Sequence, residues 1–313
     1  MVLSHEDCQL ALLAAGTGRP CNVSFFAHTP PLPDPAREAA WRQRLVPYYR
    51  EFGIDPPAIP AGPGRQPFDA RAAELVEQFR PAVVSFHFGL PAVVSFHFGL
   101  PAADLLARVK ATGACVLSSA TTVAEARWLE DRGVDAVIAQ GLEAGGHRGM
   151  FLSDDPTTQV GTFALLPQIV AAVRCPVIAA GGIATPAGVA AARALGAAAV
   201  QVGTAYLNCP EATTGALHRA ALNGEAARHT ALTNLFTGRP ARGIVNRVMG
   251  EIGPLSDAAP AFPLAASAIA PLRAAAEKLG RNDFTPLWCG QNPVCPNAPA
   301  ADITRRLAEG FTA

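Results

Sequence analysis

The sequence predicts an α/β protein that folds as a TIM-type (β/α)8 barrel with a small, mainly helical second lobe. Short runs of apolar residues recur along the chain of 313 residues, and alanine-rich segments of helical character lie between them. The runs show no polar alternation, which is typical of parallel strands covered on both faces by crossover helices. No GxGxxG motif follows an early strand, so the doubly wound alternative loses support.

Six of these runs are expected to be strands. They are NVSFFAH at 22–28, AVVSFHFG at 82–89 or in its second copy, CVLSSA at 115–120, AVIAQG at 136–141, PVIAAGG at 176–182 and AVQVGTA at 199–205. The decapeptide PAVVSFHFGL occurs at 81–90 and again at 91–100, and only one copy can fill a barrel position. An insertion after the strand would place an apolar flap over the ligand-binding end of a barrel. We therefore predict that the second copy, which contains His97, is the strand.

The helices between the strands carry recognisable end signals. One begins after Thr122 and ends before Gly133, and another begins at Thr185–Pro186 and ends before Gly196. Thr as N-cap, Pro in the first turn and Gly just past the end are the residues expected at these places. We predict a barrel over residues 1–206, a mainly helical substrate lobe over 207–283, and a segment over 284–313 that returns to the barrel with a final helix from about 301 to 309.

Composition excludes several classes of partner. The 25 basic side chains balance the 25 acidic ones, so nothing indicates binding to nucleic acid or to an anionic membrane. No stretch approaches the roughly 20 apolar residues of a membrane span. Seven scattered cysteines without a CxxC pair, and acidic Glu6 and Asp7 near the start, predict a cytoplasmic protein without a secretory signal.

The segment AQGLEAGGHRG at 139–149 is the strongest chemical signal. It lies at the carboxyl end of a predicted strand, where parallel barrels bind their ligands. Paired glycines allow close approach to a ligand, and His147 follows them directly. An isolated loop histidine is usually held by local hydrogen bonds, but its position here favours a proton-handling role.

Two further turns predict a phosphate site. AAGGIATP at 179–186 and QVGTAYL at 201–207 each follow an apolar strand and lead into a helix start. Either turn alone is weak evidence. At neighbouring strand ends, their backbone N–H groups and the helix dipole form the phosphate site common in barrels.

Several motifs together resemble class I nitronate monooxygenase, formerly called 2-nitropropane dioxygenase, from about Leu3 to the C-terminus. They are HxGxP (His97, Gly99, Pro101), EAGGHRG, PVIAAGGI, VGTAYL and LWxGQ. The Arg after the His favours this family over the flavin-dependent enoyl reductases. The resemblance implies FMN as cofactor, His147 as catalytic base, and no metal. Its implied flavin contacts are Asn22, Gln140 and Gly145, with Gly181, Gly182, Gln201, Gly203 and Thr204 at the phosphate and ribityl chain.

The family pattern also contains two features that this sequence lacks. It opens with a strand ending in a PMAG-like loop and continues with a second glycine-rich strand. The six runs above therefore correspond to strands three to eight, and we expect a barrel that is incomplete at its N-terminal side. Such a barrel would expose two strand edges.

The predicted function is the FMN-dependent oxidation of alkyl nitronates or nitroalkanes with O2. The alternatives are an NAD(P)H-dependent flavin reductase of the same fold, acting on enoyl thioesters or quinones, and a non-catalytic relative. Arg239, Arg242 and Arg247 could meet an anionic substrate or a nicotinamide phosphate, but a solvated or ion-paired face is the simpler interpretation. Trp288 is most simply a core residue. His28, His87, His218 and His229 show no metal-ligand spacing.

Overall fold

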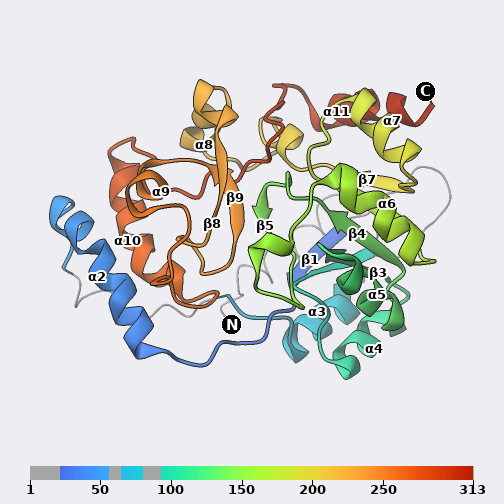
Figure 1. The fold of residues 1–313 in the computed structure, drawn as a ribbon, viewed down its shortest axis with the longest axis horizontal. Helices are drawn as coiled ribbons and strands as arrows, with labels where there is room; N and C mark the ends of the chain where they lie inside the picture. The colour runs from blue at the N-terminus through green and yellow to red at the C-terminus, as the bar shows by residue number, and fades with distance from the viewer. Residues whose placement is uncertain (1–21, 56–64, 80–92, 313) are drawn as a thin grey trace.

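The computed structural model describes residues 22–55, 65–79 and 93–312 and divides them between two lobes (Figure 1). The barrel lobe contains a parallel sheet with its helices, and the second lobe contains a small antiparallel sheet with helices around it. The first copy of the decapeptide repeat lies outside the described residues.

The barrel sheet is formed by the six predicted segments. Its strands are β1 (Asn22–Phe26), β2 (Val93–His97), β3 (Cys115–Ala120), β4 (Ala136–Gln140), β6 (Val177–Ala180) and β7 (Ala199–Gln201). All pairs are parallel and the strands follow one another in chain order, without the reversal that defines a doubly wound sheet. The second copy of the repeat supplies β2, as predicted, and His97 is its last residue. Within the described residues β1 and β7 do not pair, so the barrel is open there.

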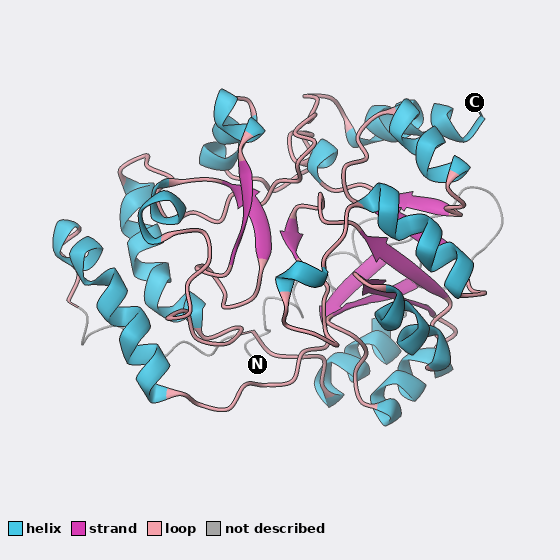
Figure 2. Cartoon of the chain, viewed as in Figure 1, coloured by secondary structure: helices cyan, strands magenta, loops and turns pink. Residues whose placement is uncertain are grey.

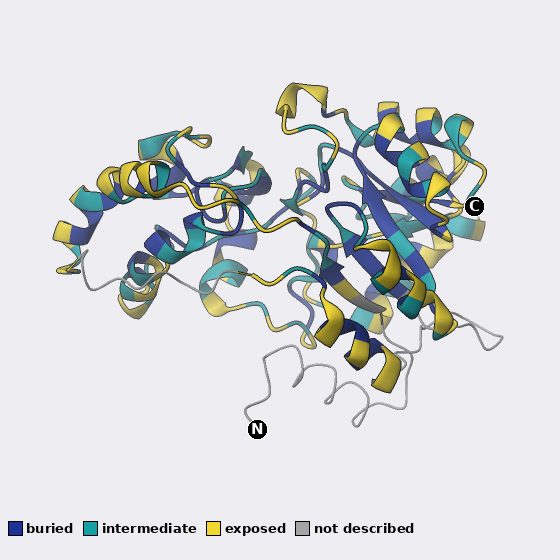
Figure 3. Cartoon of the chain, turned by 90° about the horizontal axis from the view of Figure 1, so that it is seen from below, coloured by how far each residue is buried: buried dark blue, intermediate teal, exposed yellow. Residues whose placement is uncertain are grey.

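Helices cover the outer face of this sheet (Figure 2). They are α3 (Ala70–Phe79), α4 (Ala103–Ala111), α5 (Val123–Asp131), α6 (Thr162–Ala172) and α7 (Pro186–Ala194). Thr122 and Thr185 cap α5 and α7 by accepting backbone N–H bonds, and Gly133 and Gly196 follow these helices with positive φ, so the predicted end signals are confirmed. Buried residues line the strands while the outer helix faces are exposed (Figure 3), which explains why the strand sequences are apolar throughout.

The second lobe differs from the predicted one in two respects. It contains an antiparallel sheet of β5 (Gly146–His147), β9 (Ala241–Ile244) and β8 (Thr230–Thr233), beside helices α8 (Ala216–Leu222), α9 (Arg247–Ile252) and α10 (Ala265–Lys278). It also contains α2 (Pro35–Glu51), which precedes most of the barrel in sequence. Trp41 Nε1 donates to Ala265 O (3.1 Å) and Tyr49 Oη donates to Ala268 O (2.7 Å), which joins α2 to α10 (Figure 1).

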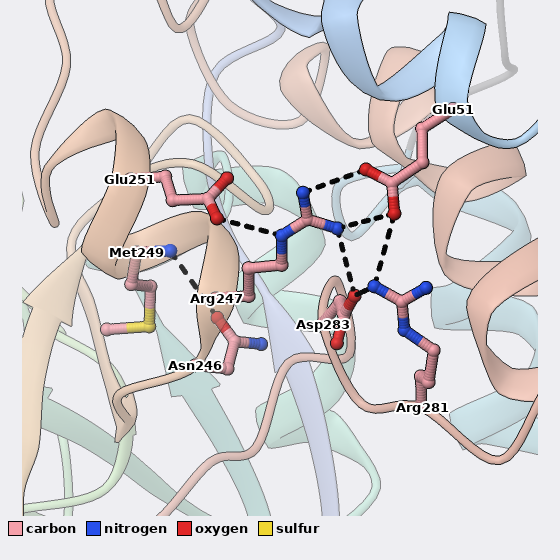
Figure 4. Close-up of polar contacts among 7 residues, drawn as sticks. All are labelled: Glu51, Asn246, Arg247, Met249, Glu251, Arg281 and Asp283. Atoms are coloured by element: carbon pink, nitrogen blue, oxygen red, sulfur yellow. Dashed lines mark hydrogen bonds and ion pairs between the residues drawn. The ribbon is translucent and has the colours of Figure 1, made fainter.

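A cluster of ion pairs joins the end of α2 to the rest of the lobe (Figure 4). Arg247 at the start of α9 contacts Glu51, Glu251 and Asp283, and Arg281 contacts Glu51 and Asp283. Glu51 thus bridges two arginines that lie 196 and 230 positions further along the chain. The hydrogen bonds from Arg247 lower the pKa of the Glu51 carboxyl.

The C-terminal segment contacts both lobes. An isolated bridge pairs Trp288 with Gly243 of β9, and α11 (Ala300–Thr312) then packs on α7. This helix is longer than the predicted one. Nowhere in the described ranges is there a helix of the length and apolarity that a bilayer span requires.

Candidate active site

The carboxyl ends of β4, β6 and β7 open into one cavity of about 230 Å3. Seven of the eight residues predicted to contact flavin line it: Gln140, Gly145, Gly181, Gly182, Gln201, Gly203 and Thr204. The eighth, Asn22, begins β1 at the other edge of the sheet, and its side chain lies outside the described part of the structure. The cavity therefore gathers residues that lie far apart in the sequence, while their individual roles stay a prediction.

The glycines around this cavity are needed for different reasons. Gly181 (φ +112°) and Gly182 (φ +73°) have backbone conformations that L residues avoid, so the turn after β6 requires them. A Cβ on Gly145 would lie 2.6 Å from the backbone of Cys289 and Gly290, so this glycine allows the C-terminal segment to pack against the loop. A Cβ on Gly203 would meet nothing within 4 Å, which leaves this side of the cavity open to a ligand.

Gln140 at the end of β4 holds the loop that carries His147. Its amide Nε2 donates to His147 O (2.9 Å), and its Oε1 accepts from Gly149 N (2.7 Å). His97 Nε2 also bonds His147 O at 3.1 Å. Both polar atoms of the Gln140 side chain are therefore engaged by the loop, although the residue lines the cavity. The family resemblance did not indicate that Gln140 also holds the loop that carries His147.

Arg148 is buried and fixes the same loop from the other side. Its guanidinium donates to Gln140 O (2.7 Å), Gly141 O (2.7 Å) and Gln159 Oε1 (3.0 Å). Burial lowers the pKa of Arg148 to about 10, with the charge of Arg242 contributing. At neutral pH it is still a cation. The residue that distinguished two families in the sequence thus acts here as a structural support for the histidine loop.

His147 lies at the boundary between the two lobes. Its Nε2 hydrogen-bonds Thr237 Oγ1 at 2.9 Å, and no described residue hydrogen-bonds its Nδ1. Its ring contacts Phe26, Phe98, Phe262 and Trp288, with centroid distances between 5.5 and 5.9 Å. Trp288 and Gly146 line the cavity, so His147 is adjacent to two lining residues, although it is not itself one of them.

The apolar surroundings keep this imidazole neutral. Burial lowers the pKa of His147 to about 3; protonation of the neighbouring His97 and the positive charges of Arg65 and Arg239 act in the same direction. Burial likewise lowers the pKa of His97 to about 4. At physiological pH both rings are uncharged, so the unpaired nitrogen of His147 carries a free lone pair that can accept a hydrogen bond, although the lowered pKa makes it a weaker base than a free imidazole.

Sequence reasoning missed Thr237, Phe26, Phe98 and Phe262, and it assigned Trp288 to the core. Thr237 and Phe262 come from the second lobe, which the sequence described only as helical. The aromatic residues looked like ordinary core or strand residues, because their convergence depends on how the two lobes meet. In the described residues no three potential metal ligands come together.

The three arginines of the segment FTGRPARGIVNRV have different environments. Arg247 is ion-paired, as favoured from the sequence. Arg242 donates to the carbonyl oxygens of Leu142 (2.9 Å) and Thr230 (3.4 Å). Arg239 lies over the ring of Phe98 at 4.3 Å and forms no ion pair with any residue in the described ranges.

Comparison with known proteins shows where this arrangement belongs. The family model described as nitronate monooxygenase matches residues 8–310. The chain belongs to the nitronate monooxygenase family. Family members are flavin-dependent oxidoreductases, so the cavity described above is the place to test for a flavin.

Individual relatives support the assignment. A nitronate monooxygenase from Pseudomonas aeruginosa is 41% identical over 94% of this chain and 82% of its own length. One from Paraburkholderia phytofirmans is 40% identical over 93% of this chain and 78% of its own length. The crystal structure of a nitroalkane oxidase from Streptomyces ansochromogenes is similar, with a TM-score of 0.81, 36% identity and 95% of this chain covered, against 82% of that chain. FabK from Thermotoga maritima, at 23% identity and a TM-score of 0.67, shares the fold.

The cavity fits a flavin nucleotide. Glycines at both turns bring the backbone close to the cavity, and the open space beside Gly203 is where a Cβ would otherwise intrude. None of the cavity-lining side chains is a lysine or arginine, so a phosphate group there would depend on backbone N–H groups and Thr204. The two glycine turns predicted a phosphate site of this kind, and its occupant stays a prediction.

Proposed function

We propose that this protein oxidises alkyl nitronates, or nitroalkanes after deprotonation, with O2 and with FMN as its cofactor. The observation that carries the proposal is the position of His147, next to a glycine-rich cavity and within a family of nitronate monooxygenases. The substrate is a small molecule, and we propose the cytoplasm as its location, in line with free thiols at all five described cysteines.

Two groups of residues would hold FMN. The turns at Gly181–Gly182 and Gly203–Thr204 would bind its phosphate and ribityl chain, and Gln140, Gly145 and Asn22 would contact its ring system or the parts beside it. FMN, when bound, supplies the electron acceptor for the oxidation and the site of reaction with O2. The residues of the chain would position the substrate and limit the access of water and protons to the active site.

His147 would handle the proton at Nδ1. The Thr237 hydroxyl donates to Arg239 O at 3.5 Å, so it is available to accept from Nε2–H of His147. This hydrogen bond orients the ring and leaves the lone pair on Nδ1. Because the ring is neutral, Nδ1 can accept the α-proton of a nitroalkane or a hydrogen bond from its surroundings.

The decisive experiment loads the protein with FMN and mixes it with ethylnitronate without oxygen. We expect the flavin absorbance to bleach, and to return when O2 is admitted. A flavin that stays oxidised with nitronate but bleaches rapidly with NADH would overturn the proposal in favour of a reductase. Protein that does not retain FMN at all would support the non-catalytic alternative.

A further inference from the structure

Arg239 is an unusual cation. Its guanidinium is partly shielded from solvent and lies 4.3 Å from the centroid of the Phe98 ring, yet no carboxylate in the described residues pairs with it. Its recorded hydrogen bond, to Met150 O, is long at 3.4 Å. Burial lowers the pKa of Arg239, and the distant charges of Asp154 and Glu125 only partly offset this. A shielded, unpaired guanidinium is a costly arrangement unless an anion completes it.

Arg239 lies near a cluster of three histidines, His28, His97 and His147. Arg239 follows Thr237, the partner of His147, by two residues, and the next residue, Pro240, accepts the N–H of Arg148 at 2.8 Å. Its positive charge contributes to the lowered pKa of His28, His97 and His147 alike. Geometry agrees with this, because the Phe98 ring under the guanidinium lies 4.7 Å from His97, 5.9 Å from His147 and 6.5 Å from His28, measured between ring centroids.

Phe98 provides the platform on which this guanidinium rests. It is the one non-glycine residue with positive φ (71°) in the described ranges, a strained conformation for a bulky side chain. That conformation turns the ring under Arg239, edge-on to His147 at 5.9 Å and stacked with Phe26 at 5.2 Å. Strain of this kind persists where the surrounding structure requires it, and functional sites are the usual place.

We propose that Arg239, stacked on Phe98, binds the anionic oxygens of the substrate and thereby selects the nitronate over the neutral nitroalkane. The planar guanidinium matches two oxygens on one atom through paired hydrogen bonds. The aromatic rings of Phe26, Phe98 and Phe262 would contact the alkyl part. This inference rests on the proposed function, because it assumes that the bound anion is a nitronate.

Nitrate is a suitable probe, since it is a planar oxyanion that cannot react. We expect the FMN-loaded protein to bind nitrate in calorimetry, and Arg239→Gln to weaken that binding at least tenfold. Arg239→Lys should retain part of it, because the charge remains while the paired geometry is lost. Arg132→Gln is the matched control: Arg132, the exposed C-cap residue of α5, also lies over an aromatic ring (Trp128, 3.7 Å), and nitrate affinity should not change.

Turnover gives a second readout. With ethylnitronate, Arg239→Gln should raise KM at least tenfold with a smaller change in kcat, and the preference for nitronate over nitroethane should fall. Unchanged nitrate affinity in Arg239→Gln, or its loss in Arg65→Gln instead, would overturn the inference, as would wild-type protein that binds no nitrate. If Arg239→Gln does not fold, the lysine variant decides by the same criteria. Nitrate binding through Arg239 in a protein that does not oxidise nitronates would refute the proposed function and leave the anion site standing.

Discussion

At the scale of single residues, His147 depends on its neighbours for its chemical state. An exposed imidazole would be partly protonated at neutral pH, whereas the rings of Phe26, Phe98, Phe262 and Trp288 keep this one neutral. Thr237 on one nitrogen determines which nitrogen remains available. The residue type could be read from the sequence, but its protonation and orientation come from side chains that the fold brings together.

Replacement of His147 should affect the two forms of the substrate unequally. For His147→Gln we expect kcat/KM with nitroethane to fall by roughly 10²–10⁴-fold, the usual contribution of a general base. The loss with preformed ethylnitronate should be smaller, because that substrate has already lost its proton. Oxygen consumption with both substrates measures this, with His229→Gln, an exposed histidine, as control. Equal losses for both substrates would exclude a role in deprotonation.

At the scale of elements, the cavity is formed by turns rather than by the strands and helices themselves. The turns after β4, β6 and β7 supply the glycines, and the C-terminal segment closes the cavity through Trp288 and Gly290. A glycine in such a turn can be required for close packing of the chain or for the space that a ligand occupies. Close contact shows that Gly145 is needed for packing, besides its proposed contact with FMN, and open space beside Gly203 leaves that glycine free for the ligand.

The two glycines should therefore respond differently to alanine. Gly145→Ala should lower the free energy of unfolding by about 1–3 kcal/mol, because its methyl group would overlap the backbone of Cys289 and Gly290. Gly203 has negative φ (−110°), so Gly203→Ala should melt like wild type without cofactor but bind FMN at least about tenfold more weakly. Thermal melts and FMN titrations of both variants test this. Weaker FMN binding without loss of stability in Gly145→Ala would contradict it.

The ion pairs at the end of α2 allow a test of how that helix is held. Glu51→Gln should lower the melting temperature by a few degrees at low salt and by less at high salt, since partly exposed ion pairs are screened. Glu225→Gln, which removes an isolated exposed pair with Arg228, is the matched control and should have no measurable effect. A salt-independent loss in Glu51→Gln would indicate that packing, not charge, holds α2.

At the scale of the whole molecule, the histidine cluster lies where the two lobes meet. His28 and His97 end or follow barrel strands, and their rings pack with Phe98 and Phe262, the latter from the second lobe. Burial lowers the pKa of His28 and of His97. The interface between the lobes is therefore built to contain neutral imidazoles.

This makes stability dependent on pH in a defined window. The folded pKa values of His97 and His147, about 4 and about 3, lie below the ordinary value of 6.5, so the unfolded chain takes up protons first as the pH falls. The free energy of unfolding should be constant above about pH 7 and decrease between pH 6.5 and 5, before most carboxylates titrate. Denaturant unfolding at several pH values measures it, and His97→Gln should show a shallower slope. A flat profile over this window would contradict the assignment of buried neutral histidines.

Much of the barrel and of the cavity could be predicted from the sequence by itself. Apolar strands, threonine caps and terminal glycines are local signals, and local chemistry determines them, so the six strands of the parallel sheet (β1, β2, β3, β4, β6 and β7) and the ends of α5 and α7 were found in place. The glycine turns at 181–182 and 203–204 were found because parallel strands end at one edge of a sheet. Their gathering in one cavity followed from that rule.

Only the tertiary structure decided the rest. The placement of α2 in the second lobe, the antiparallel pairing of β5 with β9, and the approach of Thr237 and Arg239 to His147 all join residues about ninety to more than two hundred positions apart. No local pattern encodes such contacts, because they depend on which surfaces remain to be buried once the strands and helices have formed. The sequence by itself indicates the family and its chemistry. The charge and orientation of the His147 imidazole are properties of the folded molecule.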